Sequence, residues 1–469
     1  MNYIGTRGFS EPRSFAGALL DGLAPDGGLY IPAHYPKPDF DLAATAAGDY
    51  GALTEKLLTL FGVDVLGAEA VKTAAARTKA AFLRDSQTPL TQLDDNLWLL
   101  ELYHGPTLAF KDMAMQMIAP LTDAALAQNG EKLTLVTATS GDTGAAAVRA
   151  FAGSEHVRLV VFHPLGRVSP VQRLQMTTVE ADNVLNVGVE GDFDDCQRIV
   201  KRLLGEASLK ERGLISSVNS INWGRLLGQV PYYLAASAAS GADWPDFVVP
   251  TGNFGDAFAG WVARKIGGSI GDLHAAVNSN DALALAVNTG HYLRRPAVET
   301  ASVSMDVQAP SNFERLVFEA SGRHASGTQG LFNDFNATGD VRLSPDLQSA
   351  LQAEVSASRV DEATTKATIK RVYERYGKVI CPHTAVAVAA AFERGLASRS
   401  AALGQKNDRP QIALATAHPA KFPAFVTDAL GFAPEVPDAI ANLHGQKETI
   451  REIRNDEFAA LEVVKAFAH

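Results

Sequence analysis

The sequence predicts an α/β fold in which helices cover both faces of mainly parallel sheets. From about Glu131 onward, short runs rich in β-branched residues alternate with longer segments of helical periodicity. The chain has 469 residues, enough for roughly two or three domains of about 150 residues each. Hydrophobic residues make up 46% and charged residues 20% of the sequence, as is typical of folded globular proteins.

The elements follow from pattern and length. Short apolar segments bounded by turn residues are predicted to be strands: Leu133–Ala138, Val157–Phe162, Val184–Val189, Leu214–Val218, Phe247–Val249, Leu273–Val277 and Ile412–Ala415. The longer periodic segments between them are predicted to be helices: Thr143–Phe151, Pro170–Thr178, Phe193–Leu204, Asn222–Ser240 and Asp256–Lys265. The first hundred residues or so and residues 301–376 are expected to be mostly helical and to cover the sheets.

Composition excludes several classes of function. A net charge of −10 argues against a general nucleic-acid binder. The two cysteines, Cys196 and Cys381, provide neither a disulfide framework nor a four-cysteine zinc site, and no compact histidine spacing indicates a metal. The N-terminal residues lack the apolar run of a signal peptide, and the longest uncharged stretch, 226–242, falls short of the roughly 20 apolar residues of a membrane span. We therefore expect a cytoplasmic protein without a bound metal.

The first candidate site is the segment 139–146, which follows one predicted strand and opens a predicted helix. It contains Thr139, Ser140, Gly141, Asp142 and Thr143. Small hydroxyls and the unpaired N–H groups of a helix start can hold a carboxylate or a phosphate. An ordinary strand-to-helix turn, with Asp142 or Thr143 as the helix cap, is the alternative interpretation.

A second loop, residues 250–256, follows the strand at Phe247–Val249. Gly252 and Gly255 would allow close approach of a ligand, and the next helix would direct its positive end at a phosphate. The glycine spacing matches neither a Walker A loop nor a dinucleotide fingerprint, which makes ATP and NAD weak candidates. A tight turn without ligand is the alternative.

The third candidate is Lys111, which stands among Leu108, Ala109, Phe110 and Met113 at the start of a helix. Apolar surroundings can lower the pKa of a lysine, as an imine-forming lysine requires. A solvated lysine paired with Asp112 is the alternative. Together, a reactive lysine, a phosphate cradle and a carboxylate cradle are the parts needed to hold pyridoxal phosphate and an amino-acid substrate.

These segments resemble the threonine synthase family, in its longer bacterial and fungal form, within the tryptophan-synthase-like group (fold type II) of pyridoxal-phosphate enzymes. The resemblance covers nearly the whole chain and rests on ordered strings: 6–8, 24–30, 104–112, 139–146, 220–225, 251–260 and 415–422. It implies the fold of the tryptophan synthase β-subunit, with two parallel-sheet domains and a mostly helical N-terminal region. The implied boundaries are 1–95 for the N-terminal region, 96–113 with 218–469 for the large cofactor-binding domain, and 114–217 for a smaller mobile domain.

The resemblance also implies residue roles. Lys111 would bond covalently to pyridoxal phosphate and later move protons, with Phe110 beside it. The cofactor phosphate would lie at Thr251, Gly252, Asn253, Phe254 and Gly255, and Thr416 would be a neutral partner of the pyridine nitrogen. The substrate carboxylate would lie at the turn Thr139, Ser140, Gly141, Asp142 and Thr143. The substrate phosphate would lie at Ser220, Asn222 and Arg225, since an arginine fork suits a phosphate dianion; a salt bridge is the structural alternative for Arg225.

The activity that the resemblance implies is conversion of O-phospho-L-homoserine and water to L-threonine and phosphate. Closure of the smaller domain is expected to keep bulk water out until the final step. One alternative is a threonine-synthase-like phospholyase, which releases 2-oxobutanoate, ammonia and phosphate. The other is a non-catalytic protein that binds a phosphorylated metabolite. The expected partner is the small substrate alone, without nucleic acid or membrane, for a monomer or homodimer.

Overall fold

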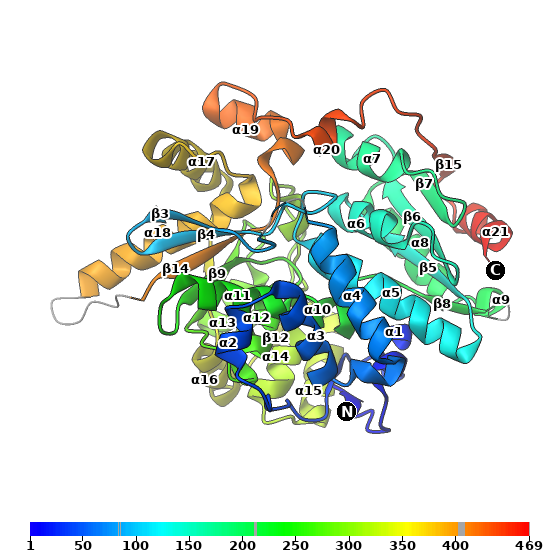
Figure 1. The fold of residues 1–469 in the computed structure, drawn as a ribbon, viewed down its shortest axis with the longest axis horizontal. Coiled ribbons are helices and arrows are strands. Elements are labelled where there is room, and N and C mark those ends of the chain that lie inside the picture. Colours follow the sequence, from blue (N-terminus) through cyan, green and yellow to red (C-terminus); the bar gives the residue numbers. More distant parts are fainter. Residues whose placement is uncertain (83, 85, 211–212, 402–408, 469) are drawn as a thin grey trace.

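The computed structural model describes residues 1–469 except 83, 85, 211–212, 402–408 and 469. Its strands form two main sheets, which lie on the left and right of the molecule in Figure 1. Two short antiparallel pairs complete the strands: β1 (Tyr3–Gly5) with β2 (Tyr30–Pro32), and β11 (His291–Leu293) with β12 (Asp340–Arg342).

The larger sheet contains six strands in the order β13-β10-β9-β14-β4-β3. In chain order they are β3 (Leu90–Asp94), β4 (Leu97–Glu101), β9 (Asp246–Pro250), β10 (Leu273–Val277), β13 (Ser356–Arg359) and β14 (Gln411–Ala415). All neighbours are parallel except β3 and β4. The parallel strands therefore end at one edge, where open α/β sheets bind their ligands.

The smaller sheet contains five parallel strands in the order β15-β7-β6-β5-β8. They are β5 (Leu133–Ala138), β6 (Val157–Pro164), β7 (Val184–Glu190), β8 (Leu214–Ser216) and β15 (Arg451–Arg454). The predicted fold class, an α/β protein of fold type II with two parallel-sheet units and an additional N-terminal region, is thus confirmed.

The helices occupy most of the remaining chain. Up to residue 240 they are α1 (Phe15–Asp21), α2 (Leu42–Ala46), α3 (Tyr50–Leu60), α4 (Ala68–Ala80), α5 (Lys111–Asn129), α6 (Asp142–Phe151), α7 (Pro170–Thr177), α8 (Phe193–Leu204), α9 (Ala207–Lys210), α10 (Trp223–Leu227) and α11 (Val230–Ser240). Beyond it lie α12 (Gly255–Lys265), α13 (Ala282–Thr289), α14 (Phe313–Ala320), α15 (Ala325–Thr338), α16 (Pro345–Glu354), α17 (Glu362–Tyr376), α18 (Pro382–Ala401), α19 (Pro423–Leu430), α20 (Asp438–Ala441) and α21 (Glu457–Phe467). Short 3-10 turns are η1 (Val63–Leu66), η2 (Val303–Met305) and η3 (Pro419–Lys421).

Both faces of the larger sheet are buried. Phe247 and Val249 of β9 belong to one hydrophobic cluster, which also contains Phe258 of α12. Val248, between them, belongs to a second cluster with Val386 of α18. Successive side chains of a strand point to opposite faces, so helices cover this sheet on both sides. The absence of a polar face explains why its strands read as continuous apolar runs.

One predicted helix is two in the structure. The segment predicted over Asn222–Ser240 divides into α10 and α11 around Gly228 and Gln229. Pro231 occupies the first turn of α11, where its missing N–H costs nothing, and it cannot continue α10. A Cβ on Gly228 would come within 2.8 Å of the Ala114 Cα, so the glycine at this break lets α5 approach closely.

Two strands pair with partners on the other side of a predicted domain boundary. β3 lies within the predicted N-terminal region 1–95 but pairs with β4 of the larger sheet. β15 lies within the predicted large domain but pairs with β7 of the smaller sheet. Only Ile453 of β15 is buried, as befits an edge strand, so the segment lacked the apolar run that marks a central strand.

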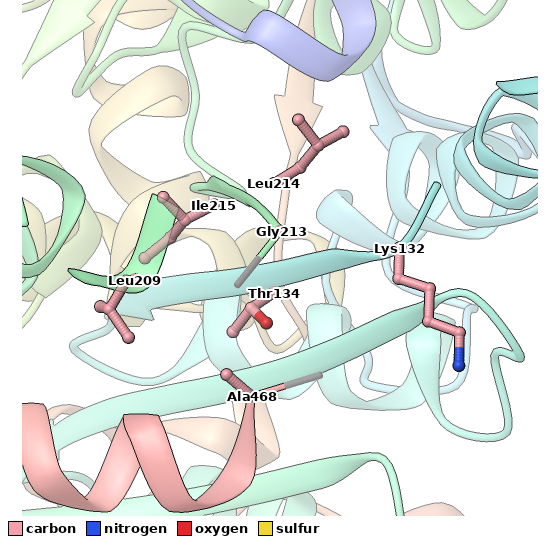
Figure 2. A pocket seen from close by; sticks show the side chains of 7 residues that line it. All are labelled: Lys132, Thr134, Leu209, Gly213, Leu214, Ile215 and Ala468. Atoms are coloured by element: carbon pink, nitrogen blue, oxygen red, sulfur yellow. The ribbon is translucent and has the colours of Figure 1, made fainter. Parts of the chain in front are cut away.

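A small pocket lies at the start of β5, next to the edge strand β8 and Ala468 (Figure 2). Lys132, which is charged, is one of the described residues that line it, and its amine points away from the other labelled side chains (Figure 2). The turn at 139–146 follows the opposite end of β5, so this pocket is not part of the candidate site. Among the described helices, none combines the length and apolarity needed to cross a membrane.

Candidate active site

The segment that carries Lys111 is joined to the segment after β14. The Phe110 N–H donates a 2.8 Å hydrogen bond to the Thr416 carbonyl, and the His418 N–H donates to the Leu108 carbonyl at 3.1 Å. Leu108 adopts a positive φ of 57°, an unusual conformation that these contacts hold in place. Lys111, Phe110 and Thr416, the three residues that the resemblance assigns to the aldehyde and ring of the cofactor, therefore lie close together.

The side chain of Lys111 is only 10% exposed. Its amine lies 3.3 Å from Asp142 Oδ2 and 3.2 Å from Ser304 Oγ, and 5.4 Å from the centre of the Phe110 ring. Burial lowers the pKa of the Lys111 amine below its ordinary value; the cations Lys421 and Arg225 add to the effect and Asp142 opposes it. Asp112 instead accepts from the Thr107 N–H and hydroxyl, so the alternative of a solvated Lys111 paired with Asp112 is wrong.

The glycine loop lies next to the same serine. A Cβ on Gly252 would collide with the Ser304 carbonyl, so the loop passes directly beside the residue that contacts the lysine. Phe254 has a positive φ of 62° and starts α12 without a side-chain cap. Among the hydrogen bonds of the described residues, the N–H groups of Asn253, Phe254, Gly255 and Asp256 have no protein acceptor. The loop thus presents a row of free donors at the positive end of a helix.

Other side chains of this loop are engaged in the protein. The Thr251 hydroxyl donates to the Val249 carbonyl at 2.7 Å, and the Phe254 ring packs against Phe313 in the core. The Asn253 carbonyl accepts from Asn312, while its own side chain is partly exposed. The donors available to an anion are therefore chiefly backbone N–H groups.

The turn after β5 is held by Thr139, whose hydroxyl accepts from the N–H groups of Gly141 and Gly144 at 3.0 and 2.9 Å. Gly141 has φ 143°, and a Cβ there would collide with the Gln172 side chain, so both conformation and space require glycine. Ser140 and Thr143 are partly exposed. The hydroxyls of these two residues thus border the site, whereas Thr139 supports the turn from within.

Asp142 has a different environment from its neighbours. Its carboxylate lies between Lys111 and Lys421, and accepts from the Gln172 amide at 2.8 Å. Burial alone would raise the pKa of Asp142, but the two ammonium groups hold it well below its usual range. Asp142 is therefore ionised, and both of its carboxylate oxygens already have partners within the protein.

The third predicted cluster separates into two roles. Asn222 caps α10 through the Gly224 N–H at 2.9 Å and donates to the Leu19 carbonyl at 2.8 Å.

Arg225 is buried and, among the described residues, no acidic side chain pairs with it. Burial lowers the pKa of Arg225 to about 10, which leaves it charged at neutral pH. The structural alternative of a salt bridge for Arg225 is thus wrong. Ser220 is partly exposed beside them, and its carbonyl accepts from Asn312.

Sequence reasoning did not select Ser304, Lys421, Gln172 or His383. His383 lies at the start of α18, and its Nε2 accepts from the Ser304 N–H at 3.3 Å. Burial lowers the pKa of His383 to about 3, so its ring is neutral. Ser304 and His383 lie outside every glycine-rich string and strand end that sequence reasoning used, and only tertiary structure brings them to Lys111.

The residues present fit pyridoxal phosphate. A buried amine of lowered pKa can bond to an aldehyde, the free N–H groups of the glycine loop suit its phosphate, and Thr416, joined to Phe110 through its carbonyl, carries a neutral hydroxyl. Among the described residues, no group of three His, Cys, Asp or Glu side chains is arranged to hold a metal ion. The arrangement offers one amine for an aldehyde and free N–H groups for an anion, among largely buried side chains.

Comparisons with known proteins agree over the whole chain. A family model described as pyridoxal-phosphate dependent enzyme matches residues 81–329. Models described as threonine synthase N terminus and threonine synthase, C-terminal, match residues 2–78 and 384–467.

Individual relatives extend this agreement. Threonine synthase of Pseudomonas aeruginosa is 38% identical over 460 residues, which are 97% of this chain and 96% of that protein. The crystal structure of pyridoxal-phosphate-bound threonine synthase from Brucella melitensis is 41% identical, covers 100% of both chains and has a TM-score of 0.94. Yeast threonine synthase is 33% identical, with a TM-score of 0.91 over 99% of this chain and 98% of that chain.

Proposed function

The chain belongs to the threonine synthase family, and from this membership we infer that it converts O-phospho-L-homoserine and water to L-threonine and phosphate, with pyridoxal phosphate as cofactor. The observation that carries the reaction to this chain is the buried amine of Lys111, which faces Ser304 beside the glycine loop. When bound, the cofactor supplies an electron sink that stabilises negative charge on the substrate carbons as protons leave.

Lys111 is proposed to hold the cofactor and then to move protons at the substrate. A base works best when its pKa lies near the working pH, and burial lowers the pKa of this amine in that direction. Thr416 follows the end of β14, and its carbonyl is fixed by the Phe110 N–H. A neutral hydroxyl there would not force a proton onto the cofactor ring, so Lys111 has to carry the proton transfers.

Arg225 is proposed to bind the substrate phosphate. A buried guanidinium without an acidic partner is costly unless an anion completes it, and a phosphate can accept two of its N–H groups at once. Ser220 would contribute beside it. Both polar groups of the Asn222 side chain are engaged, so we propose that Asn222 shapes this site rather than contacts the phosphate.

The substrate carboxylate is proposed to lie at the turn 140–144. The hydroxyls of Ser140 and Thr143 border the site, and the N–H groups of Asp142 and Thr143 have no protein acceptor among the described hydrogen bonds. The turn belongs to the smaller sheet and Lys111 follows the larger one. Movement of the unit 114–217 would therefore open and close the space between them and exclude water.

Product analysis tests this function. Purified protein with pyridoxal phosphate and O-phospho-L-homoserine is expected to release threonine and phosphate in equal amounts. Release of 2-oxobutanoate and ammonia with the phosphate would identify a phospholyase instead. A protein that takes up no cofactor and releases no phosphate would be the non-catalytic binder.

We also propose that the protein acts in the cytoplasm as a monomer or homodimer. Its two cysteines are buried thiols without a disulfide, which suits a reducing compartment. Analytical ultracentrifugation of the holoenzyme is expected to give one of these two masses, and a larger assembly would contradict the proposal.

A further inference from the structure

One carboxylate joins two lysines at the site. Asp142 Oδ1 lies 2.7 Å from the Lys421 amine, and Asp142 Oδ2 lies 3.3 Å from the Lys111 amine. The side chain of Lys421 has no solvent exposure, and its amine also donates to the Thr107 carbonyl at 2.6 Å. Both oxygens of Asp142 are thus bound to cations.

The bridge crosses between the two sheets. Asp142 begins α6 after β5 of the smaller sheet, whereas Lys421 ends η3, which follows β14 of the larger sheet. Gln172 of α7 binds the same carboxylate oxygen as Lys421 and thereby fixes its direction from the side of the smaller sheet. Lys421 thus gives Asp142 a second contact with the larger-sheet side of the molecule, in addition to its contact with Lys111.

A buried lysine with no solvent contact is costly unless its charge is matched. Nothing in the covalent chemistry proposed above uses Lys421, so its burial at this position needs another reason. The charged groups that act on the Lys111 amine are Asp142, Lys421 and Arg225, and the neutral ring of His383 lies close by. Asp142 favours a proton on that nitrogen, whereas the positive charge of Lys421 disfavours it.

We propose that Lys421 is a positioning residue for the reaction, which acts on Lys111 through Asp142. By holding one carboxylate oxygen, it keeps the other beside the Lys111 nitrogen. Its charge also neutralises Asp142 within the turn that is proposed to take the substrate carboxylate. This inference rests on the proposed function only in that the cofactor is attached to Lys111.

The test follows the visible absorption band of the bound cofactor as a function of pH, because this band reports protonation of the nitrogen that Lys111 contributes. In the Lys421→Met holoenzyme, Asp142 acts on that nitrogen without its counter-charge. The midpoint of the titration is expected to rise by about one pH unit relative to the unchanged protein. The KM for O-phospho-L-homoserine is expected to rise about tenfold, since an unbalanced anion would face the substrate carboxylate.

Two further variants show whether Lys421 acts through Asp142. Asp142→Asn is expected to lower the midpoint, because the carboxylate that favours the proton is gone. In the Asp142→Asn background, adding Lys421→Met is expected to raise the midpoint by less than it does in the unchanged protein, because only the direct effect of the Lys421 charge remains. Lys378→Met is the matched control: Lys378 pairs with the buried Glu101 at the end of β4 and makes no contact with Asp142, so the midpoint is expected to stay.

An unchanged midpoint in folded Lys421→Met holoenzyme would overturn the proposal, as would an equal shift in Lys378→Met. If Lys421→Met alone loses the cofactor, the double variant, which removes both buried charges, is expected to regain it; failure to do so also overturns the proposal. The midpoint does not depend on which product forms, so a wrong reaction assignment and a wrong role for Lys421 give different results.

Discussion

The Lys111 amine lies 3.2 Å from the hydroxyl of Ser304, and the carbonyl of that serine closes the space beside Gly252. One residue thus connects the reactive amine to the loop that is proposed to hold the cofactor phosphate. This meets the geometric requirement of the proposed function, because the two groups must reach opposite ends of one small molecule.

Replacement of Lys111 by alanine is expected to remove the visible absorption of the bound cofactor and to lower activity at least about a thousandfold, because no other amine is proposed to bond to the aldehyde. Absorption spectra and product release measure the two effects. Lys132→Ala, at the pocket beside β8, is the control and is expected to keep both. An unchanged spectrum in the Lys111 variant would rule out this lysine.

Replacement of Arg225 by alanine is expected to raise the KM for O-phospho-L-homoserine about 100-fold, equivalent to about 3 kcal/mol, through loss of a charge-assisted contact with phosphate. Steady-state kinetics and the cofactor content of the purified protein are the measurements. Arg264→Ala, whose guanidinium pairs with Glu354, is the control. Loss of cofactor from the Arg225 variant would show that this arginine holds the other phosphate.

Replacement of Gly252 by alanine is expected to weaken cofactor binding about tenfold or more, because the new methyl group would push the Ser304 carbonyl and the loop apart. Fluorescence titration of the apo-protein with pyridoxal phosphate measures the affinity. The control is Gly330→Ala, on an exposed part of α15 where a Cβ would meet nothing within 4 Å. That substitution is expected to stabilise the helix by up to about 1 kcal/mol without changing the affinity.

Asp256 gives a prediction on pH. Burial raises its pKa from 3.8 to about 6, while Tyr232 and Tyr233 donate to one of its oxygens. The folded state therefore binds the proton more tightly than the unfolded state, so the carboxyl stabilises the protein below about pH 4 and this stabilisation is lost as pH rises through 6. The neutral amide of Asp256→Asn avoids the cost of burying a charged carboxylate at high pH.

The free energy of unfolding of Asp256→Asn minus that of the unchanged protein is thus expected to increase by about 2 to 3 kcal/mol from pH 4 to pH 8. Urea unfolding at several pH values measures this difference. A difference that is constant with pH would show that the Asp256 carboxyl titrates normally in the folded protein.

The central elements of the fold could be predicted because their sequence and their environment agree. Strands β5 and β10 and helix α8 end where the apolar pattern ends. β13 and β15 were missed since they are edge strands with few buried residues, and edge strands need only one apolar face or none. β3 and β4 were missed because they lie in a region expected to be helical.

The site shows a similar division. Lys111, the loop at Gly252 and the turn at Gly141 could be found because each follows a strand and joins a helix, and such places have local sequence signals. Arg225 was found through the resemblance and stands out in the structure because no acidic side chain among the described residues pairs with it. Ser304 and Lys421 could not be assigned roles, because their importance comes only from neighbours that lie far away in the sequence.

The last strand of the smaller sheet, β15, comes from the C-terminal end of the chain. β15 is made long after β7, so β7 keeps an open edge while the residues between them are synthesised, and an open edge invites pairing with other chains. A stop codon before Arg451 would spare every residue proposed to contact cofactor or substrate and yet is expected to yield protein that aggregates.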